Sequence, residues 1–278
     1  MARVEAAQLD AGSASRWRER AGDLAWRVAP FVSVGLLIVA WEAVARSGMV
    51  TAYMLPGPWI VLERIGTDAV AGDLWINMAL TLYRAFAGFA IAAVVGIALG
   101  FAMARNRIAN WFFDPIISVG FPMPKIAFLP VVILWLGLFD VTKVTMIALD
   151  AVFPVITATL VGIAGVEREL LWSARNMGAS EREVLRQVVL PAALPQIMTG
   201  LQVALPIALI VAVVTEMVMG GYGLGGAMMT AWRFANSAGV FAGIVEIAAV
   251  GWLVVKGMAL VRRRLLLWHP EAMEPSTA

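Results

Sequence analysis

The chain has 278 residues, of which 61% are hydrophobic and 14% charged, whereas soluble domains average about 45–50% apolar and about 25% charged residues. The hydrophobic residues lie in long runs with almost no charge, and about 20 such residues span a bilayer as a helix, so the composition predicts an all-α, polytopic membrane protein and excludes a soluble enzyme. With no cysteine, one histidine (His269) and a net charge of +2, the chain offers no cysteine-ligated metal site, no histidine cluster and no basic surplus for nucleic acid.

The first 76 residues divide into a tail and a first span with its loop. Residues 1–27 carry five arginines interleaved with acidic residues and lack the layout of a signal peptide, so we expect a solvated tail. In the region 28–76, the apolar run Pro30–Ala45 is predicted to form the first membrane span. The segment Arg46–Asn77 is polar and turn-rich, with room for a short surface helix.

The second predicted span, Ala85–Ala104, runs without a charge. Small residues recur within it at every fourth position, at Ala92, Gly96, Gly100 and Ala104. Such a stripe lets a second helix approach closely inside a membrane. We therefore expect this face of the second span to pack against another helix.

The third predicted span, Phe113–Phe139, contains Pro122 and Pro124, which remove backbone donors and kink a helix. In lipid, such a break persists only when it is buried in protein or lines a cavity. Three further spans follow, and they are Val144–Val166, Ile197–Met219 and Gly239–Val261. The chain is thus expected to have about six transmembrane helices.

The basic residues predict the orientation of these spans. Fourteen Lys and Arg residues fall on the face that carries both termini and four on the opposite face. Loops rich in Lys and Arg stay in the cytoplasm. We therefore expect both termini, including the tail at residues 269–278, to be cytoplasmic.

The segment 167–199, which is expected in the cytoplasm between the fourth and fifth spans, is predicted to have a defined local structure. Glu169–Met177 has helical propensity and ends at Gly178, the residue best suited to the left-handed conformation after a helix. The segment is therefore more than an unstructured connector.

A second helix is predicted directly after this turn. Ser180 and Glu183 have the spacing of a capping box, in which each side chain satisfies the backbone N–H of the other. We expect this helix to run to Leu190 and to end at Pro191. Its simplest interpretation is a surface helical hairpin.

The spacing within the hairpin supports a more specific interpretation. It resembles the EAA signature of ATP-binding-cassette importer permeases, a Glu-Ala-Ala triplet, three residues, Gly, nine residues and Ile-x-Leu-Pro. The Gly corresponds to Gly178, and the glutamate and first alanine are replaced here by Trp172 and Ser173. The remaining matched positions are Ala174, Val188, Val189, Leu190 and Pro191.

The resemblance covers most of the chain, from about residue 77 to 268. It rests on Leu82 with Arg84, Asp114-Pro115, the run PMPKIAFLPVVILWLG, FPV at Phe153 to Val155, NMGASEREVLRQVVLPAALPQIMTGL, and TEMVMG followed by GLG. These motifs are similar to those of permeases of nitrate, sulfonate, taurine and bicarbonate importers. The region 77–268 is accordingly expected to be the permease core.

Family membership would imply partners and a coupling element. Such permeases work as dimers in the bacterial inner membrane, with an extracytoplasmic solute-binding protein and separate cytoplasmic ATPase subunits that hold ATP and Mg. The hairpin would dock on the ATPase, and this chain would bind no cofactor. The coupling residues implied by the resemblance are Trp172, Ser173, Ala174, Gly178, Ala179, Ser180, Arg182, Glu183, Arg186, Leu190 and Pro191.

Glycine-rich motifs in the chain do not indicate nucleotide binding. The run from Gly221 to Gly226 matches G-x-G-x-x-G, but no strand precedes it and the topology places it near the extracytoplasmic side. No G-x-x-x-x-G-K-[ST] loop occurs in the sequence. The ATPase must therefore be another polypeptide.

Ionisable residues inside spans cost roughly 2.5–3.5 kcal/mol at a helix centre, so they tend to face a cavity or a partner. Lys125, Asp150, Glu216 and Met217 are candidates for the translocation pathway. Alternatively, Asp150 and Glu246 form polar pairs between helices, Glu216 bonds to the adjacent glycine-rich turn, and an acid neutralises Lys125.

The sequence thus favours the permease subunit of an ATP-driven, binding-protein-dependent importer of a small anionic solute. Two alternatives stay open. One is a secondary transporter driven by an ion gradient, which would show inverted repeats. The other is a permease of the same type for an uncharged or aromatic solute, such as a pyrimidine precursor.

Overall fold

The computed structural model describes residues 32–268. The chain divides after Glu63 into two compact units. In the first unit, residues 32–46 form a helix, and Trp41 Nε1 donates a hydrogen bond to Pro56 O over 3.0 Å. This helix is the described part of the predicted first span, Pro30–Ala45, which begins outside the described residues.

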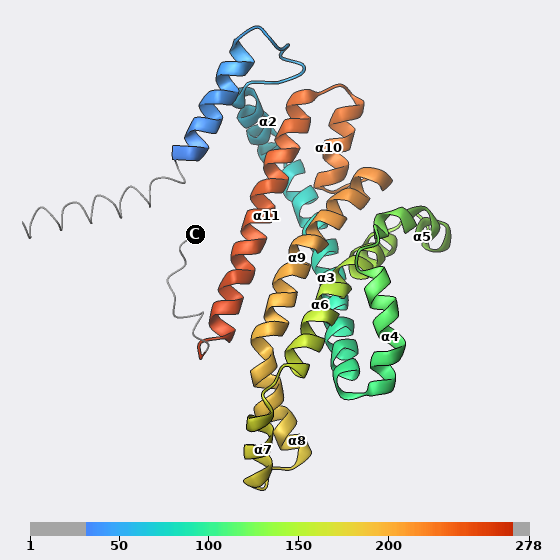
Figure 1. Cartoon of the computed structure of the whole chain (residues 1–278). Coiled ribbons are helices and arrows are strands. Elements are labelled where there is room, and N and C mark those ends of the chain that lie inside the picture. The colour runs from blue at the N-terminus through green and yellow to red at the C-terminus, as the bar shows by residue number, and fades with distance from the viewer. Residues whose placement is uncertain (1–31, 269–278) are drawn as a thin grey trace, which may run out of the picture. The chain divides into compact units, whose positions relative to one another are not determined.

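The helices that follow are shown in Figure 1. They are α2 (Pro58–Ala71), α3 (Asp73–Arg105), α4 (Arg107–Gly120), a 3-10 turn (Lys125–Phe128), α5 (Leu129–Leu136), α6 (Asp140–Ala164), α7 (Arg168–Asn176), α8 (Glu181–Glu183), a π-helical segment (Val184–Val189), α9 (Leu190–Met219), α10 (Leu224–Arg233) and α11 (Ser237–Leu265). Residues 32–268 contain no strand. The all-α prediction is confirmed.

Four helical segments among the described residues are long and apolar enough to cross a membrane. They are α3, α6, α11 and the segment Glu181–Arg233, which contains α9. These correspond to the second, fourth, sixth and fifth predicted spans. The described residues therefore support four spans, or five if α4 and α5 together count as one, and the first of the six predicted spans begins outside them.

The third predicted span, Phe113–Phe139, is not a single kinked helix. α4 and the segment Lys125–Leu136 meet at an angle of 92° across a short break. Pro122 and Pro124 lie in this break, where each removes a backbone donor. The two prolines thus divide the predicted span into two helical pieces.

Helix α6 packs against both α3 and α9. A Cβ atom added at Gly96 of α3 would lie 2.7 Å from Val155 Cβ of α6, and one added at Gly100 would lie 2.7 Å from Ile156 O. Any side chain at these positions would push the two helices apart. The predicted small-residue stripe is confirmed as the contact face of α3 with α6.

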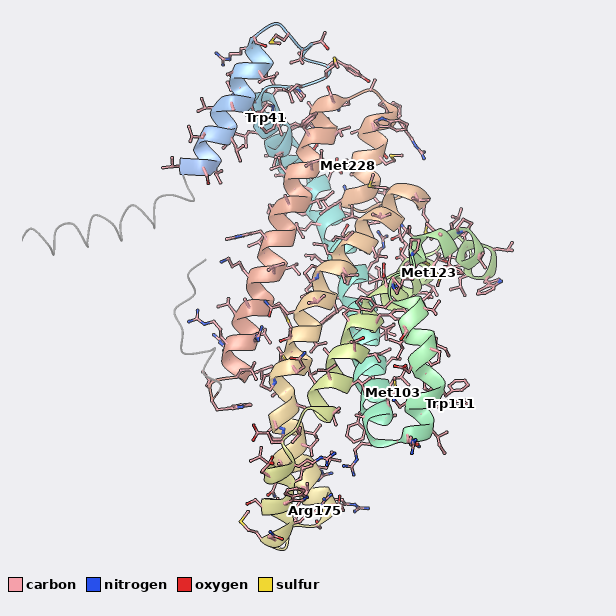
Figure 2. All side chains as sticks on the ribbon, in the orientation of Figure 1. Trp41, Met103, Trp111, Met123, Arg175 and Met228 are labelled. Carbon is pink, nitrogen blue, oxygen red and sulfur yellow. The ribbon has the colours of Figure 1, made fainter. Side chains whose placement is uncertain are left out.

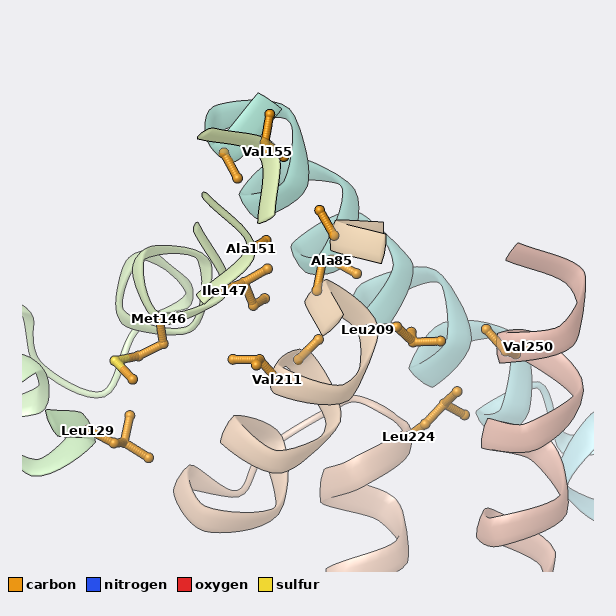
Figure 3. Packing of buried hydrophobic residues seen from close by; sticks show 14 of the residues in the cluster. Ala85, Leu129, Met146, Ile147, Ala151, Val155, Leu209, Val211, Leu224 and Val250 are labelled. Carbon is orange, nitrogen blue, oxygen red and sulfur yellow. The ribbon is translucent and has the colours of Figure 1, made fainter. Parts of the chain in front are cut away.

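The core of the second unit draws side chains from several helices (Figure 3). Leu129 of α5, Ile147 of α6, Leu209 of α9, Leu224 of α10 and Val250 of α11 belong to one buried cluster. Each contributes an apolar side chain that is at most 6% exposed, and burial of one such side chain stabilises a fold by about 1.5–3 kcal/mol. This cluster fixes α10 against the long helices.

The structure differs from the sequence-based expectation in two of the segments that connect the predicted spans. The segment Arg46–Asn77 is largely helical, since α2 is the expected surface helix and α3 already begins at Asp73. Lys143, which directly precedes the predicted fourth span, lies in α6 and is only 4% exposed. Asp140 in the first turn of α6 favours this earlier helix start, because a carboxylate stabilises the positive end of a helix dipole.

Candidate functional site

The hairpin turn after α7 has the geometry that the sequence predicts. Gly178 has φ +87°, which is in the left-handed region of backbone conformation. Glycine adopts this conformation freely, whereas it is strained for a residue that carries a side chain. The Gly178 N–H donates to Arg175 O over 2.9 Å, and Ala179 N–H donates to Ala174 O over 3.1 Å. These two bonds form a Schellman motif, which fixes the direction in which the chain leaves the helix.

The second half of the hairpin begins with the predicted capping box. Ser180 Oγ accepts a hydrogen bond from Glu183 N, and Ser180 N–H donates to Glu183 Oε2 over 2.8 Å. The first turn therefore has both reciprocal bonds of the motif.

The predicted end of this helix at Pro191 is wrong. The helix continues from Glu181 through Val184–Val189 into α9, with Pro191 inside the first turn of α9. In Val184–Val189 the helix is π-helical, and Leu190 N–H bonds to Leu185 O. A wider π turn next to the proline accommodates its ring and its missing donor without breaking the helix. The hairpin and α9 are consequently one continuous element.

Ion pairs hold the two arms of the hairpin together. Arg175 Nε lies 2.9 Å from Glu181 Oε1, and Arg105 of α3 reaches the same carboxylate at 3.9 Å. Figure 2 shows Arg175 on this hairpin, far from the broken α4–α5 segment around Met123. Exposed pairs of this kind contribute little stability, about 0–1 kcal/mol each. Their role is therefore to fix orientation.

The remaining predicted coupling residues are mostly exposed. Trp172 is 55% exposed and Leu190 is 38% exposed, whereas Ala174 is 6% exposed. The exposed positions of the predicted set also include Ser173, Arg182, Glu183, Arg186 and Pro191, while Ala179 is partly buried. The hairpin thus presents both an indole ring and charged side chains to its surroundings.

The break in the third predicted span is the site of a charge pair. Lys125 Nζ lies 3.1 Å from Asp150 Oδ1 of α6 and donates to Phe121 O over 2.9 Å. The ammonium also lies 4.4 Å from the centre of the Phe153 ring, within cation–π range. Two candidate pathway residues are thus brought together, and the expected acid partner of Lys125 is Asp150.

Glu216 lies in a different environment, at the end of α9. Its side chain is fully buried and accepts hydrogen bonds from Thr81 Oγ1 at 2.8 Å, Arg84 Nη1 at 2.7 Å and Gly225 N at 3.1 Å. A Cβ atom added at Gly223 would lie 2.3 Å from the Glu216 carboxyl carbon. The glycine-rich turn therefore closes directly over the carboxylate, as the hydrogen-bonding alternative for Glu216 expects.

The charges around Glu216 extend to α6. Arg84 Nε bonds to Asp140 Oδ1 at 2.8 Å, and Arg84 Nη1 bonds to Tyr222 O at 2.6 Å. Lys143 Nζ donates to Gly220 O over 3.1 Å. We call Thr81, Arg84, Asp140, Lys143 and Glu216 the Glu216 cluster. With two cations and two carboxylates it is neutral, and it joins α3, α6 and α9 to the turn before α10.

The hairpin and the Glu216 cluster lie at opposite ends of α9 (Figure 1). Leu190 and Glu216 are separated by about 40 Å along a helix that rises 1.5 Å per residue. A displacement of the hairpin therefore reaches the cluster through one continuous helix.

The run from Gly221 to Gly226 connects α9 to α10. Gly223 N–H donates to Asn77 Oδ1 over 2.8 Å, and Gly225 N–H donates to Glu216. These donors bond to protein side chains, whereas a dinucleotide fingerprint follows a strand and turns its donors toward a pyrophosphate. The run is a helix connection.

The last two predicted positions have less defined roles. Met217 is partly buried on α9. For Glu246 of α11 the expected polar pair is not observed, since its buried Oε1 has no hydrogen-bond partner within the described residues. Within residues 32–268, no group of three or more His, Cys, Asp or Glu side chains is arranged to hold a metal ion.

Sequence reasoning missed most of the Glu216 cluster. Arg84 follows a polar segment and directly precedes the uncharged run of the second predicted span, where an arginine is ordinary. Asp140 and Lys143 are spaced by three, which puts both on one face of a helix start. The sequence signal for this cluster was therefore the presence of four charged residues, an arginine, a lysine and two acids, near the ends of predicted spans. Which of these charges pair with one another is decided only by the fold.

Comparisons with known proteins identify the family. The family described as binding-protein-dependent transport system inner membrane component matches residues 92–266. The taurine transport system permease protein TauC of Escherichia coli (strain K12) is 33% identical over 244 residues, which are 86% of this chain and 89% of TauC.

Two further relatives differ in what their names say they transport. SsuC of Bacillus subtilis (strain 168), named for aliphatic sulfonates transport, is 33% identical over 84% of this chain and 85% of its own. The riboflavin transport system permease protein RibX of Chloroflexus aurantiacus is 31% identical over 86% of this chain and 89% of its own.

A solved structure supports the fold. An inward-facing conformation of the MetNI methionine ABC transporter contains a chain that matches with a TM-score of 0.54 and 19% identity, covering 70% of this chain and 95% of that one. Together with the family match over residues 92–266, these findings show that the chain belongs to the binding-protein-dependent transport system inner membrane components, the permease subunits of such transporters.

Proposed function

We propose that this permease couples ATP hydrolysis by a separate cytoplasmic ATPase to solute import, and that the hairpin at 167–199 is the coupling element. The observation that carries the proposal is the hairpin's rigid construction. It has a Schellman turn at Gly178, a capping box at Ser180 and no break between Glu181 and α9. A rigid element transmits a displacement that a flexible loop would absorb.

The hairpin is attached directly to two spans. α6 ends at Ala164 and α7 begins at Arg168, while α8 continues into α9. Closure of an ATPase dimer against Trp172, Arg182 and the other exposed hairpin residues would therefore move α6 and α9 together. The ATPase would supply the sites for ATP and Mg.

We further propose that the end of the molecule that carries the hairpin faces the cytoplasm, with both termini on that side of the inner membrane. The support is the distribution of basic residues, with fourteen on the face of the hairpin and termini. An extracytoplasmic solute-binding protein would then meet the opposite end, where α10 follows the glycine-rich turn.

The broken segment between α4 and α5 is our proposed place for the second permease copy and the pathway. Lys125 and Asp150 have side chains that are 11% and 26% exposed in the single chain. A charged pair and a helix break cannot face lipid without cost. This face is therefore covered by a second copy of the chain or lines a water-filled path between the two copies.

For the solute we propose a small organic anion, such as a sulfonate. The names of TauC and SsuC support this class. Lys125 supports it less than its sequence position suggests, because Asp150 neutralises the ammonium at 3.1 Å. The name of RibX keeps an aromatic solute as the second candidate.

The test compares two glycines that both have open space around them but differ in backbone conformation. Gly178 has φ +87° and nothing within 4 Å of an added Cβ, while Gly257 in α11 also has open space but no positive φ. In vesicles that also contain a partner ATPase and a solute-binding protein, Gly178→Val should lower solute uptake and solute-stimulated ATP hydrolysis together, by about tenfold or more, for a strain of about 1–3 kcal/mol.

The control Gly257→Val should retain both activities. Wild-type uptake with Gly178→Val would contradict the coupling role of the hairpin. Uptake driven by an ion gradient without any ATPase would contradict the whole proposal and favour the secondary transporter.

A further inference from the structure

The turn at residues 220–223, which joins α9 to α10, is bonded to side chains of another helix. Asn77 Oδ1 of α3 accepts a hydrogen bond from Gly223 N–H at 2.8 Å. Thr81 Oγ1, one helical turn further along α3, accepts from Leu224 N–H at 2.9 Å. Residues spaced by four lie on one face of a helix. One face of α3 therefore holds the main chain where α10 begins.

The two cations of the Glu216 cluster bond to the carbonyl groups of the same turn. Arg84 of α3 donates to Tyr222 O, and Lys143 of α6 donates to Gly220 O. Helices α3 and α6 pack closely against each other, and α9 packs against both. These three helices form one packed body, and four of its side chains bond to the main chain that leads into α10.

The backbone of the turn has the composition of a hinge. Gly220, Gly221 and Gly223 have φ values of +73°, +86° and +128°, and glycine moves among such conformations more easily than any residue with a side chain. Beyond the turn, α10 packs against α11, where a Cβ atom added at Gly243 would lie 2.9 Å from Met228 Cβ. α10 and the adjoining part of α11 are thus a second packed body, and a few loop residues of this kind can serve as the hinge between two bodies.

We propose that α10 swings about this turn during the ATP-driven cycle, and that four side chains of α3 and α6 form a latch that holds it in the position seen in the structure, namely Asn77, Thr81, Arg84 and Lys143. This movement rests on the proposed function, since the ATPase drives the cycle. Buried polar clusters are best attested in registry and switch roles rather than as a source of stability. In the latched position Leu224 is only 1% exposed, so a swing of α10 uncovers it.

The first experiment measures this exposure with a single thiol, because the chain has no cysteine of its own. In vesicles with a partner ATPase and a solute-binding protein, Leu224→Cys should react slowly with an impermeant thiol reagent at rest and several-fold faster while ATP is hydrolysed. The matched control is Val211→Cys, which lies on α9 in the same apolar cluster, is 6% exposed and should stay slow. Equal acceleration at both positions, or an unchanged rate at Leu224→Cys, overturns the proposal.

The second experiment removes one bond of the latch. Asn77→Ala should raise the resting reaction rate of Leu224→Cys about fivefold, which corresponds to the loss of one hydrogen bond of about 1 kcal/mol. Asn110→Ala is the matched control, because the buried Oδ1 of Asn110 has no hydrogen-bond partner within residues 32–268. It should leave the rate within about twofold of its starting value. An unchanged rate in Asn77→Ala overturns the latch.

A cross-link tests the swing without removing a latch bond. Leu74 of α3 and Ala227 of α10 line one cavity of about 490 Å³, so a short cleavable reagent that joins Leu74→Cys to Ala227→Cys should stop uptake until it is cleaved. The control link joins Ala227→Cys to Phe234→Cys, which lines the same cavity directly after α10, and should leave uptake unchanged.

The outcomes separate this proposal from the proposed function. Normal uptake with the link between α3 and α10 in place overturns the swing of α10. ATP-driven uptake in which Leu224→Cys stays protected likewise contradicts the swing alone. Uptake that never depends on ATP contradicts the proposed function, and the swing with it.

Discussion

Removal of the charge of Glu216 tests whether the Glu216 cluster holds the end of the permease opposite the hairpin. In Glu216→Gln the side chain keeps nearly the same shape. The ionised acceptor that receives bonds from Thr81, Arg84 and Gly225 is lost, and Arg84 keeps only Asp140 as a carboxylate partner.

The magnitude follows from burial. Glu216 is 0% exposed and Arg84 is 4% exposed, and breaking a buried ion pair by removing one partner costs about 3–5 kcal/mol. The charge-assisted bonds alone account for about 1.5–3 kcal/mol each. For a chain of this size we expect a fall in melting temperature on the order of 10 °C.

The assay is thermal unfolding of the purified permease in detergent. Unfolding is monitored as the loss of the monodisperse species with rising temperature. The matched control is Glu246→Gln, because the buried Oε1 of Glu246 has no hydrogen-bond partner within the described residues. It should melt within about 2 °C of wild type, since it loses no hydrogen bond there. A double-mutant cycle with Arg84→Gln should show coupling of at least about 1 kcal/mol.

Two results would contradict this role of the Glu216 cluster: a melting temperature of Glu216→Gln equal to that of the control, or effects of Glu216→Gln and Arg84→Gln that simply add. Either result would mean that the carboxylate and the guanidinium do not depend on each other, although they lie 2.7 Å apart.

Three further predictions concern the hairpin and the broken span. Ser180→Ala removes the capping side chain and should cost about 1 kcal/mol of local stability, seen as faster amide hydrogen exchange in the hairpin; equal exchange would contradict the cap's role. Ser180→Cys should react with an impermeant thiol reagent only in inverted vesicles, and labelling from outside intact cells would overturn the topology. Lys125→Gln should lower the maximal uptake rate more than the apparent affinity. If the Lys125–Asp150 pair is purely structural, the double variant with Asp150→Asn should recover uptake, because it removes both charges; continued loss would assign Lys125 to the solute path.

The local structure of the hairpin could be predicted because it depends on residues close in sequence. A glycine after a helix and a serine three residues before a glutamate fix their turns through neighbouring backbone groups. Gly178 and Ser180 adopt these conformations in the structure. The continuation of the helix through Pro191 was not predictable in this way, since it depends on the π turn before it.

The sequence alone determined the membrane class, the helical fold, most spans and the close contact along the small-residue stripe of α3, because hydrophobicity and periodicity are properties of short stretches of chain. Tertiary structure alone decided which charges meet. Arg84 and Glu216 are 132 positions apart, and Lys143 and Gly220 are 77 apart. A charge pair depends on distance in space, and that distance is set only once α3, α6 and α9 pack together.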